Sequence, residues 1–252
     1  MKSIQFNEEN YIHYDHTAWN DKVLKVKTNE IYQLNFDTIT NGKLLVEEFE
    51  KTCIEENINY SIVRINATER KIKDIFSLFG YENIETSFRV INNLKKIKNN
   101  ENFNRFKIKI EKPNKLSNKV EIKNIVYKDF NFGRFFEDPQ IKEEQARLRN
   151  SNWVDSLYEN SNILGGFYKS QLFGFMAYKI NKNSIILELG GVESKFSYLA
   201  YPFWYSCLHT FKNIGFDSIN TIISANNIGI INLYSYFDFK FNDSYLSLRK
   251  FR

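Results

Sequence analysis

The stretch of residues 184–239 constrains the fold most, because strand-like and helix-like patterns alternate along it. Ser184–Leu189 is a short, mostly apolar run, as expected for a buried strand. Residues 202–214 place apolar side chains on one helical face, and residues 228–237 do so at three-residue spacing. Residues 217–225, between these two helices, are typical of a second strand. The order strand, helix, strand, helix, followed by a last strand, predicts a mixed α/β domain.

Glycine, proline and asparagine mark the ends of these elements. The pair Gly190 and Gly191 is expected to break the first strand. Pro202 fits the first turn of the following helix, where a missing N–H costs nothing, and Gly215 fits just past its end. Asn227 can cap the second helix.

The second helix and its flanks carry a motif. An asparagine is followed by an apolar residue three positions on, by Leu-Tyr at six and seven, and then by an aromatic residue that starts a strand. These residues are Asn227, Ile230, Leu233, Tyr234, Asp238 and Phe239. This pattern resembles the ending of the GCN5-related N-acetyltransferase fold, in which glycine usually takes the position of Asp238.

The upstream half of the same family motif is a valine that ends a strand, followed by a phosphate loop of the form Arg-x-x-Gly-x-Gly. Val192 is present here, but the arginine and both glycines of the loop are missing. The residues at the loop are Ser197, Tyr198, Leu199, Ala200, Tyr201 and Pro202. Weaker or rearranged binding of coenzyme A is one interpretation, and an ordinary strand–helix connection is the alternative.

The resemblance implies an acyltransferase fold with a mixed, largely antiparallel sheet and acetyl-CoA as co-substrate. Acetyl-CoA would lie in a V-shaped gap between strands 184–189 and 217–225, with its pyrophosphate at the start of helix 202–214. The residues implied to bind it are Gly190, Gly191, Val192, Ser197, Tyr198, Leu199, Ala200, Tyr201 and Asn227. A bulge at the two glycines and a simple N-cap at Asn227 are the structural alternatives.

Two residues are candidates for chemistry under this resemblance. Tyr234 would donate a proton to the thiolate that leaves the thioester, and packing on its helix is the alternative. Glu188, a carboxylate in an otherwise apolar strand, would act as the general base, and a solvent-facing position is equally open. No metal is implied.

The layout as a whole is similar to acetyltransferases that act on nucleotide-linked amino sugars, such as TDP-fucosamine acetyltransferase. That similarity implies transfer to the amine of such a sugar, with Arg134 and Asp138 in contact with the nucleotide or sugar. These two residues could equally cap the next helix. Two other interpretations stay open: transfer to another small amine, and a non-catalytic binding protein with a degenerate loop.

The first part of the chain repeats the later pattern in miniature. Residues 1–98 predict a smaller α/β half-domain, in which a strand, a helix ended by Gly80 and a closing strand follow one another. Residues 99–104 are polar and predict a linker, and residues 105–252 form the acetyltransferase domain.

Composition points to a reducing compartment. No apolar stretch resembles a signal peptide or a membrane helix, and Cys53 and Cys207 lie far apart. A cytoplasmic protein without a membrane partner is therefore expected. The oligomeric state is open, with a homodimer as one alternative.

A basic block precedes the second domain. Residues 95–128 contain eleven Lys or Arg and three Glu, a balance of 11 − 3 = +8. Phosphate or nucleic-acid binding is one interpretation. The lysines of residues 106–110 alternate with apolar residues and lack interleaved aromatics, so a solvated linker and strand face is favoured, and no nucleic-acid partner is expected.

Overall fold

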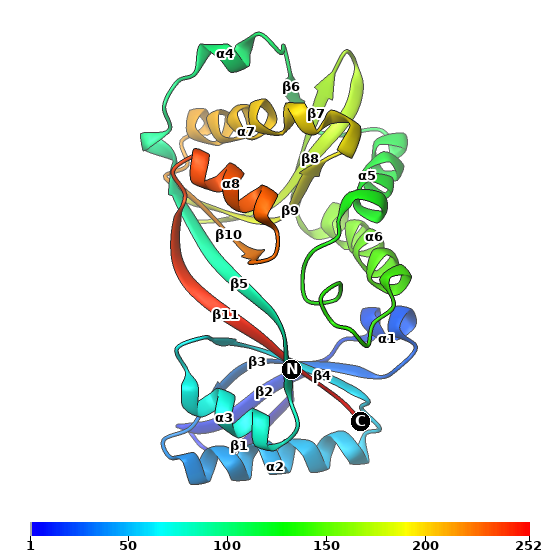
Figure 1. Cartoon of the computed structure of the whole chain (residues 1–252), viewed down its shortest axis with the longest axis vertical. Coiled ribbons are helices and arrows are strands. Elements are labelled where there is room, and N and C mark those ends of the chain that lie inside the picture. The colour runs from blue at the N-terminus through cyan, green and yellow to red at the C-terminus, as the bar shows by residue number, and fades with distance from the viewer. Residues whose placement is uncertain (1) are drawn as a thin grey trace.

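The computed structural model describes residues 2–252, and its eleven strands form one sheet (Figure 1). The strand order is β1-β2-β3-β4-β11-β5-β10-β9-β8-β7-β6. The strands are β1 Lys2–Asn7, β2 Asn10–His16, β3 Thr28–Asn35, β4 Tyr60–Asn66, β5 Glu82–Asn93, β6 Lys109–Glu111, β7 Asn162–Tyr168, β8 Gln171–Asn181, β9 Ser184–Val192, β10 Ser218–Ser224 and β11 Lys240–Phe251. Only β3/β4 and β9/β10 pair in parallel within the described chain, so the predicted mixed, mostly antiparallel sheet is confirmed.

Helices cover both faces of the half of the sheet that ends at β6. Figure 1 shows α5 and α6 on one side of it and α7 and α8 on the other, while α2 and α3 cover the N-terminal half. The helices of the described residues are α1 Ala18–Leu24, α2 Ile39–Glu55, α3 Arg70–Leu78, α4 Glu101–Asn104, α5 Leu116–Asp129, α6 Glu143–Asn160, α7 Ala200–Ile214 and α8 Ile228–Tyr236, with 3₁₀ turns η1 Leu94–Lys96 and η2 Ser194–Leu199.

The two halves of the chain share one order of elements and exchange their last strands. The first half runs β3, α2, β4, α3, β5, and the second runs β9, α7, β10, α8, β11. β5, from the first half, pairs with β10 of the second, whereas β11, from the second half, pairs with β4 of the first. β5 and β11 also pair with each other, and Figure 1 shows them running side by side through the middle of the molecule. The exchange therefore joins both halves into one sheet.

The internal repeat extends to single residues. In the first half, the carbonyl of Phe76 accepts a hydrogen bond from the N–H of Tyr81 at 3.0 Å. In the second half, the carbonyl of Tyr234 accepts the equivalent bond from Phe239, also at 3.0 Å. Phe76 and Tyr234 thus occupy corresponding positions, and only Tyr234 has a hydroxyl.

The same repeat explains an unusual aspartate. The residue before the aromatic that starts the next strand has a positive φ in both halves: 81° at Gly80 and 59° at Asp238. Aspartate tolerates this left-handed conformation better than most residues with a side chain. Asp238 can therefore stand where the related motif has glycine.

Four apolar clusters hold the layers together. The largest packs α7 and α8 on β8, β9 and β10, and a second packs α2 and α3 on the N-terminal strands. A third packs α5 and α6 on the opposite face of β7 and β8. The fourth is centred on Tyr60, Phe135 and Ala146 and joins α6 and the 133–141 segment to β4. This fourth cluster fixes the position of α6 relative to the N-terminal half.

Some boundaries differ from the sequence-based expectations. Gly190 and Gly191 do not break the strand, because both remain paired with β8 as β9 continues to Val192. Helix α7 begins at Ala200 rather than Pro202, since first-turn N–H groups have no partner within the helix and a proline is tolerated there.

The predicted division of the chain into residues 1–98, 99–104 and 105–252 stays a prediction. The predicted linker contains the short helix α4, and its neighbour η1 packs against α7. No helix within residues 2–252 is long and apolar enough to cross a membrane.

Candidate active site

The sheet opens between two parallel strands. β9 and β10 pair only from Ser184–Ile186 to Ser218–Asn220. Beyond this point, residues 187–192 pair with β8 alone and residues 221–224 pair with β5 alone. At the vertex, the hydroxyl of Thr221 donates a hydrogen bond to the carbonyl of Leu187 at 3.1 Å. The predicted V-shaped gap is therefore present, and the β9 backbone along it is unpaired on one side.

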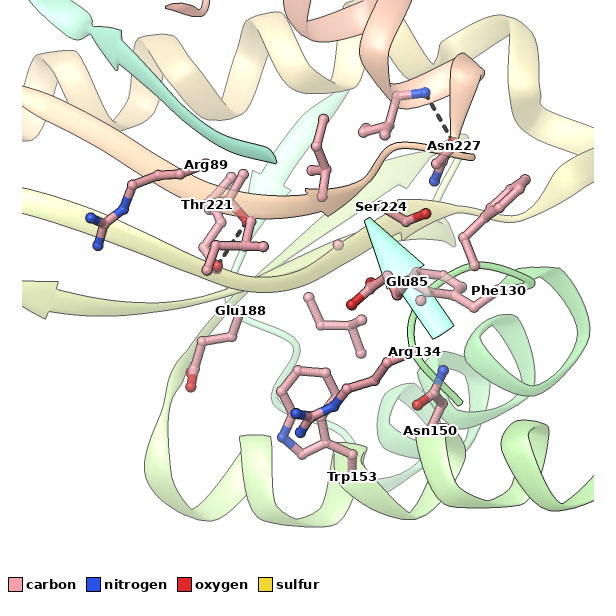
Figure 2. A pocket seen from close by; sticks show the side chains of 18 of the residues that line it. Glu85, Arg89, Phe130, Arg134, Asn150, Trp153, Glu188, Thr221, Ser224 and Asn227 are labelled. Carbon is pink, nitrogen blue, oxygen red and sulfur yellow. Dashed lines mark hydrogen bonds between the residues drawn. The ribbon is translucent and has the colours of Figure 1, made fainter. Parts of the chain in front are cut away.

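A cavity of about 480 Å³ passes through this opening. Its lining comes from β9 and β10, from α7 and α8 on one face, and from α6 and the 130–135 segment on the other. β4 and β5 of the N-terminal half contribute Arg64, Glu85 and Arg89. Figure 2 shows Glu85 and Arg89 of β5 together with Asn150 and Trp153 of α6 around the cavity. A volume of this size is typical of a site for a small ligand.

Tyr234 lies on the α7/α8 side of the cavity and is 3% exposed. Its ring packs on Phe239, with ring centroids 4.4 Å apart, and meets Trp204 at 6.4 Å. Burial raises the pKa of Tyr234, so the phenol keeps its proton at neutral pH. The buried indole N–H of Trp204 adjoins the Tyr234 hydroxyl and partly opposes this rise in pKa. Tyr234 therefore places a proton donor beside the split in the sheet, with the Trp204 N–H next to it.

Asn227 caps a helix at the edge of the cavity, and its predicted contact with acetyl-CoA stays a prediction. Its side chain accepts a hydrogen bond from the N–H of Ile230 at 3.1 Å, which makes it the N-cap of α8. It also lines the cavity, as Figure 2 shows.

The two predicted glycines differ in their surroundings. Gly190 lines the cavity, and Gly191 faces the ring of Phe130. A Cβ at position 191 would lie 2.6 Å from Cζ of Phe130, so the strand can approach this ring only without a side chain. Val192 pairs with Gly174 at the end of β9.

The predicted phosphate loop is not an open loop, because residues 197–199 belong to the 3₁₀ turn η2 and residues 200–202 to the first turn of α7. The N–H of Ala200 already donates to the carbonyl of Ser197, and Pro202 has no N–H. Leu199 is buried in the core, Tyr198 is 58% exposed, and Tyr201 packs on Tyr236. None of residues 197–201 lines the cavity. This segment offers a pyrophosphate fewer free amides than an open glycine loop would.

Glu188 lines the cavity with both carboxylate oxygens occupied. One oxygen accepts from Lys179 Nζ at 2.7 Å and the other from the hydroxyl of Ser161. Figure 2 shows the carboxylate pointing away from Thr221. With a partner on each oxygen, Glu188 has fewer free lone pairs with which to accept a proton, and its role as base stays a prediction.

Glu85 is a second carboxylate in the cavity that the sequence did not single out. It is 5% exposed, and its Oε2 accepts hydrogen bonds from Ser247 at 2.7 Å and Arg64 at 3.2 Å. Its Oε1 has no hydrogen-bond partner among the described residues, and Figure 2 shows the carboxylate facing into the cavity. Glu85 lies three residues before Phe88, where the closing strand of the N-terminal half was predicted to begin, so no sequence pattern distinguished it.

The structure places the two residues predicted to contact the substrate in different surroundings. Arg134 lines the cavity, where its guanidinium binds Glu30 through two hydrogen bonds of 2.6 and 2.8 Å. Asp138 does not line the cavity and is 1% exposed. Its carboxylate accepts from Arg249 at 3.1 Å, from Tyr60 and, as a local cap, from the N–H of Gln140. Asp138 thus belongs to a buried hydrogen-bond network, although Lys142 and not Asp138 is the N-cap of α6.

We expect Asp138→Ala to lower the free energy of unfolding by about 3 kcal/mol. This is the low end for a broken buried ion pair, because Glu82 keeps a 3.0 Å contact with Arg249. Chemical denaturation measures the loss. The matched variant Glu82→Ala removes a 64% exposed partner and should cost less than about 1 kcal/mol. A stable Asp138→Ala protein with impaired acceptor binding would instead support a substrate contact.

Comparisons with known proteins bear on the fold. No protein-family model and no curated protein matches the chain. Solved structures do match. A GCN5-related N-acetyltransferase from Sphaerobacter thermophilus aligns over 96% of this chain and 76% of its own, with a TM-score of 0.63 and 14% identity. The fold is that of the GCN5-related N-acetyltransferases.

Two further structures extend the comparison. A tandem protein of this type from the clavulanic acid biosynthesis pathway covers 89% of this chain and 75% of its own, with a TM-score of 0.58 and 9% identity. A fungal glucosamine N-acetyltransferase region covers 95% of this chain and 31% of its multi-domain protein, with a TM-score of 0.69 and 12% identity. The tandem match accords with the repeat of elements in the two halves.

Residues 2–252 contain no group of three or more His, Cys, Asp or Glu side chains arranged to hold a metal ion.

Proposed function

We propose that this protein transfers the acetyl group of acetyl-CoA to the amine of a small acceptor. The observation that carries the proposal is the split between β9 and β10, with the buried hydroxyl of Tyr234 beside it. The unpaired β9 backbone can hydrogen-bond the pantetheine amides as an added strand would. The acceptor enters from the face covered by α6.

The chemistry needs a proton acceptor and a proton donor. The neutral amine attacks the thioester carbonyl, and the nitrogen then loses a proton as the carbon–sulfur bond breaks. We assign the donor to Tyr234, which protonates the departing thiolate. We assign the acceptor to Glu85 in preference to Glu188, because only Glu85 has a carboxylate oxygen without a protein partner. Both reactants are held together, so no covalent enzyme intermediate is required.

For the acceptor, we propose an amino sugar carried on a nucleotide. The support is the resemblance of the chain's layout to acetyltransferases of that class. One structural neighbour is also described as a glucosamine N-acetyltransferase region, whose acceptor is a sugar amine.

The test has two parts. Titration calorimetry with acetyl-CoA measures binding, and release of free thiol in the presence of amino sugars and nucleotide-linked amino sugars measures transfer. Binding together with amine-dependent thiol release supports the proposal. A folded protein that binds the acceptors but not acetyl-CoA would overturn it.

That last outcome would favour a second function, a binding protein that has lost acetyl-CoA. The observation behind it is η2, whose 3₁₀ bonds use amides that an open phosphate loop would leave free.

The variant Ala200→Asp tests whether the pyrophosphate of acetyl-CoA binds at the start of α7. If the pyrophosphate lies there, the new carboxylate places like charges a few ångströms apart, at a cost between about 1 and 4 kcal/mol. Calorimetry should then show weaker acetyl-CoA binding with an unchanged melting temperature. Ala200→Asn is the uncharged control and should bind nearly as wild type does. Equal affinity for both variants would place the pyrophosphate elsewhere.

A further inference from the structure

Four arginines line the cavity, and three of them have a carboxylate partner. The pairs are Arg64 with Glu85 at 3.2 Å, Arg89 with Asp243 at 3.8 Å and Arg134 with Glu30 at 2.6 Å. The fourth, Arg149, forms no ion pair with any residue of the described chain 2–252. Its charge is therefore available to something else.

Arg149 is held in position by neutral groups. Its Nε donates to Oδ1 of Asn20 at 3.2 Å, and its Nη1 donates to Oδ1 of Asn150 at 3.1 Å. Its guanidinium carbon lies 4.5 Å from the ring centroid of Phe135 and 5.2 Å from that of Trp153. Aromatic contacts fix the plane of a guanidinium and leave its edges available for hydrogen bonds.

Helix α6 presents three hydrogen-bond donors that have no acceptor in the described chain. Nη2 of Arg149, Nδ2 of Asn150 and the indole N–H of Trp153 form no hydrogen bond with another described residue. All three residues line the cavity, and Asn150 is only 8% exposed. Figure 2 shows Asn150 and Trp153 projecting from α6 toward the cavity. Three donors without an acceptor, one of them charged, suit an oxyanion.

The charge of Arg149 is costly without such a ligand. Burial, and then the positive charge of Arg134, lower the pKa of Arg149 to about 9. The guanidinium is thus still charged at pH 7, in surroundings that disfavour charge. The carboxylate of Glu30 acts in the opposite direction, but it is already paired with Arg134. The buried charge of Arg149 therefore has a ligand-free cost that an anion would offset.

We propose that the acceptor is an amine that also carries a carboxylate or phosphate group, and that Arg149, Asn150 and Trp153 bind this oxyanion. This inference rests on the proposed function, because it concerns the acceptor of the same reaction. The site is distinct from the expected position of the coenzyme A pyrophosphate, because α6 and the start of α7 lie on opposite faces of the sheet (Figure 1). The oxyanion is held at the α6 end of the cavity, and the amine is directed toward the split between β9 and β10.

The test uses three amines of matched length: aminopropyl phosphate, gamma-aminobutanoate and aminopropanol. Calorimetry on the wild-type protein should show binding of one or both of the first two and little binding of aminopropanol, and the tighter of the two identifies the oxyanion. Arg149→Gln should weaken that binding by roughly 10- to 100-fold, the range for a charged hydrogen bond. Arg149→Lys should recover part of it.

Controls separate this role from folding and from net charge. Arg70→Gln removes an exposed positive charge from α3 and should leave binding unchanged. Ligand-free Arg149→Gln should melt at or above the wild-type temperature, whereas a purely structural arginine would melt lower when replaced. Equal binding of the anionic amines by wild type and Arg149→Gln would overturn the proposal, and so would equally tight binding of aminopropanol.

Acetyl-CoA binding by the same variants distinguishes the two proposals. A protein that binds acetyl-CoA but no anionic amine overturns only the oxyanion site. One that binds the anionic amine but no acetyl-CoA overturns only the acetyltransferase. Loss of acetyl-CoA affinity in Arg149→Gln, with competition between the two ligands, would mean that Arg149 binds a phosphate of coenzyme A and would also overturn the oxyanion site.

Discussion

Replacing Tyr234 with phenylalanine is expected to slow turnover by roughly 10² to 10⁴, the contribution of a positioned general acid. This corresponds to about 3 to 5 kcal/mol of activation free energy. The ring of Tyr234 packs on Phe239 and Trp204, and phenylalanine keeps that packing. The Michaelis constant for acetyl-CoA should change little, because the lost interaction matters mainly as the thiolate forms.

Steady-state kinetics and a melting curve on one preparation measure both effects. Tyr236→Phe is the matched control on the same helix, since Tyr236 is 52% exposed and its hydroxyl accepts a hydrogen bond from Asn100. Turnover of Tyr234→Phe within about threefold of wild type would show that Tyr234 is not the acid.

The pH profile gives an independent readout of Tyr234. Burial raises its pKa, so the phenol loses its proton only above the ordinary tyrosine value of about 10. A general acid is active while protonated, so Tyr234 should cause no fall in turnover up to that pH.

Glu85→Gln is expected to lower turnover by roughly 10² to 10⁴, because glutamine keeps the shape of the side chain but cannot accept the amine proton. The amide oxygen can still accept the hydrogen bonds that Ser247 and Arg64 now give to Oε2. The fold should therefore survive, and acetyl-CoA binding should be close to that of wild type.

Glu188→Gln is the paired experiment. Both oxygens of Glu188 are occupied by Lys179 and Ser161, so its replacement should change turnover by less than about tenfold if Glu85 is the base. The opposite pattern, a large loss at Glu188 and a small one at Glu85, would restore the assignment made from the sequence.

Local patterns predicted most elements of the second half of the chain. The apolar periodicity of α7 and α8, the cap at Asn227 and the strand-like runs of β9 and β10 all depend on residues close in sequence. The fold class followed from their order, and the structural neighbours confirm it.

The composition of the cavity could not be predicted in the same way. Glu85 reaches it only because β5, a strand of the first half, is inserted beside β10 of the second. Local sequence does not encode such an exchange, since either half could have closed on its own last strand. Arg149 and Asn150 lie on α6, and nothing in helical periodicity distinguishes an arginine without an ion pair from a surface one.

The internal repeat also explains why one half carries the candidate site. Phe76 occupies the position that corresponds to Tyr234, is fully buried and lacks a hydroxyl. The first half therefore has no proton donor at the equivalent place. Its contribution to the cavity is made through β4 and β5 instead.

The exchanged strands make the order of synthesis matter for this chain. β4 ends at Asn66, but its partner β11 begins only at Lys240, so this edge of β4 lacks its native partner while all the residues between them emerge from the ribosome. An uncovered strand edge invites pairing with other chains, and contacts between distant residues form slowly. We therefore expect chaperones to bind the nascent chain until its last strand, β11, has left the ribosome.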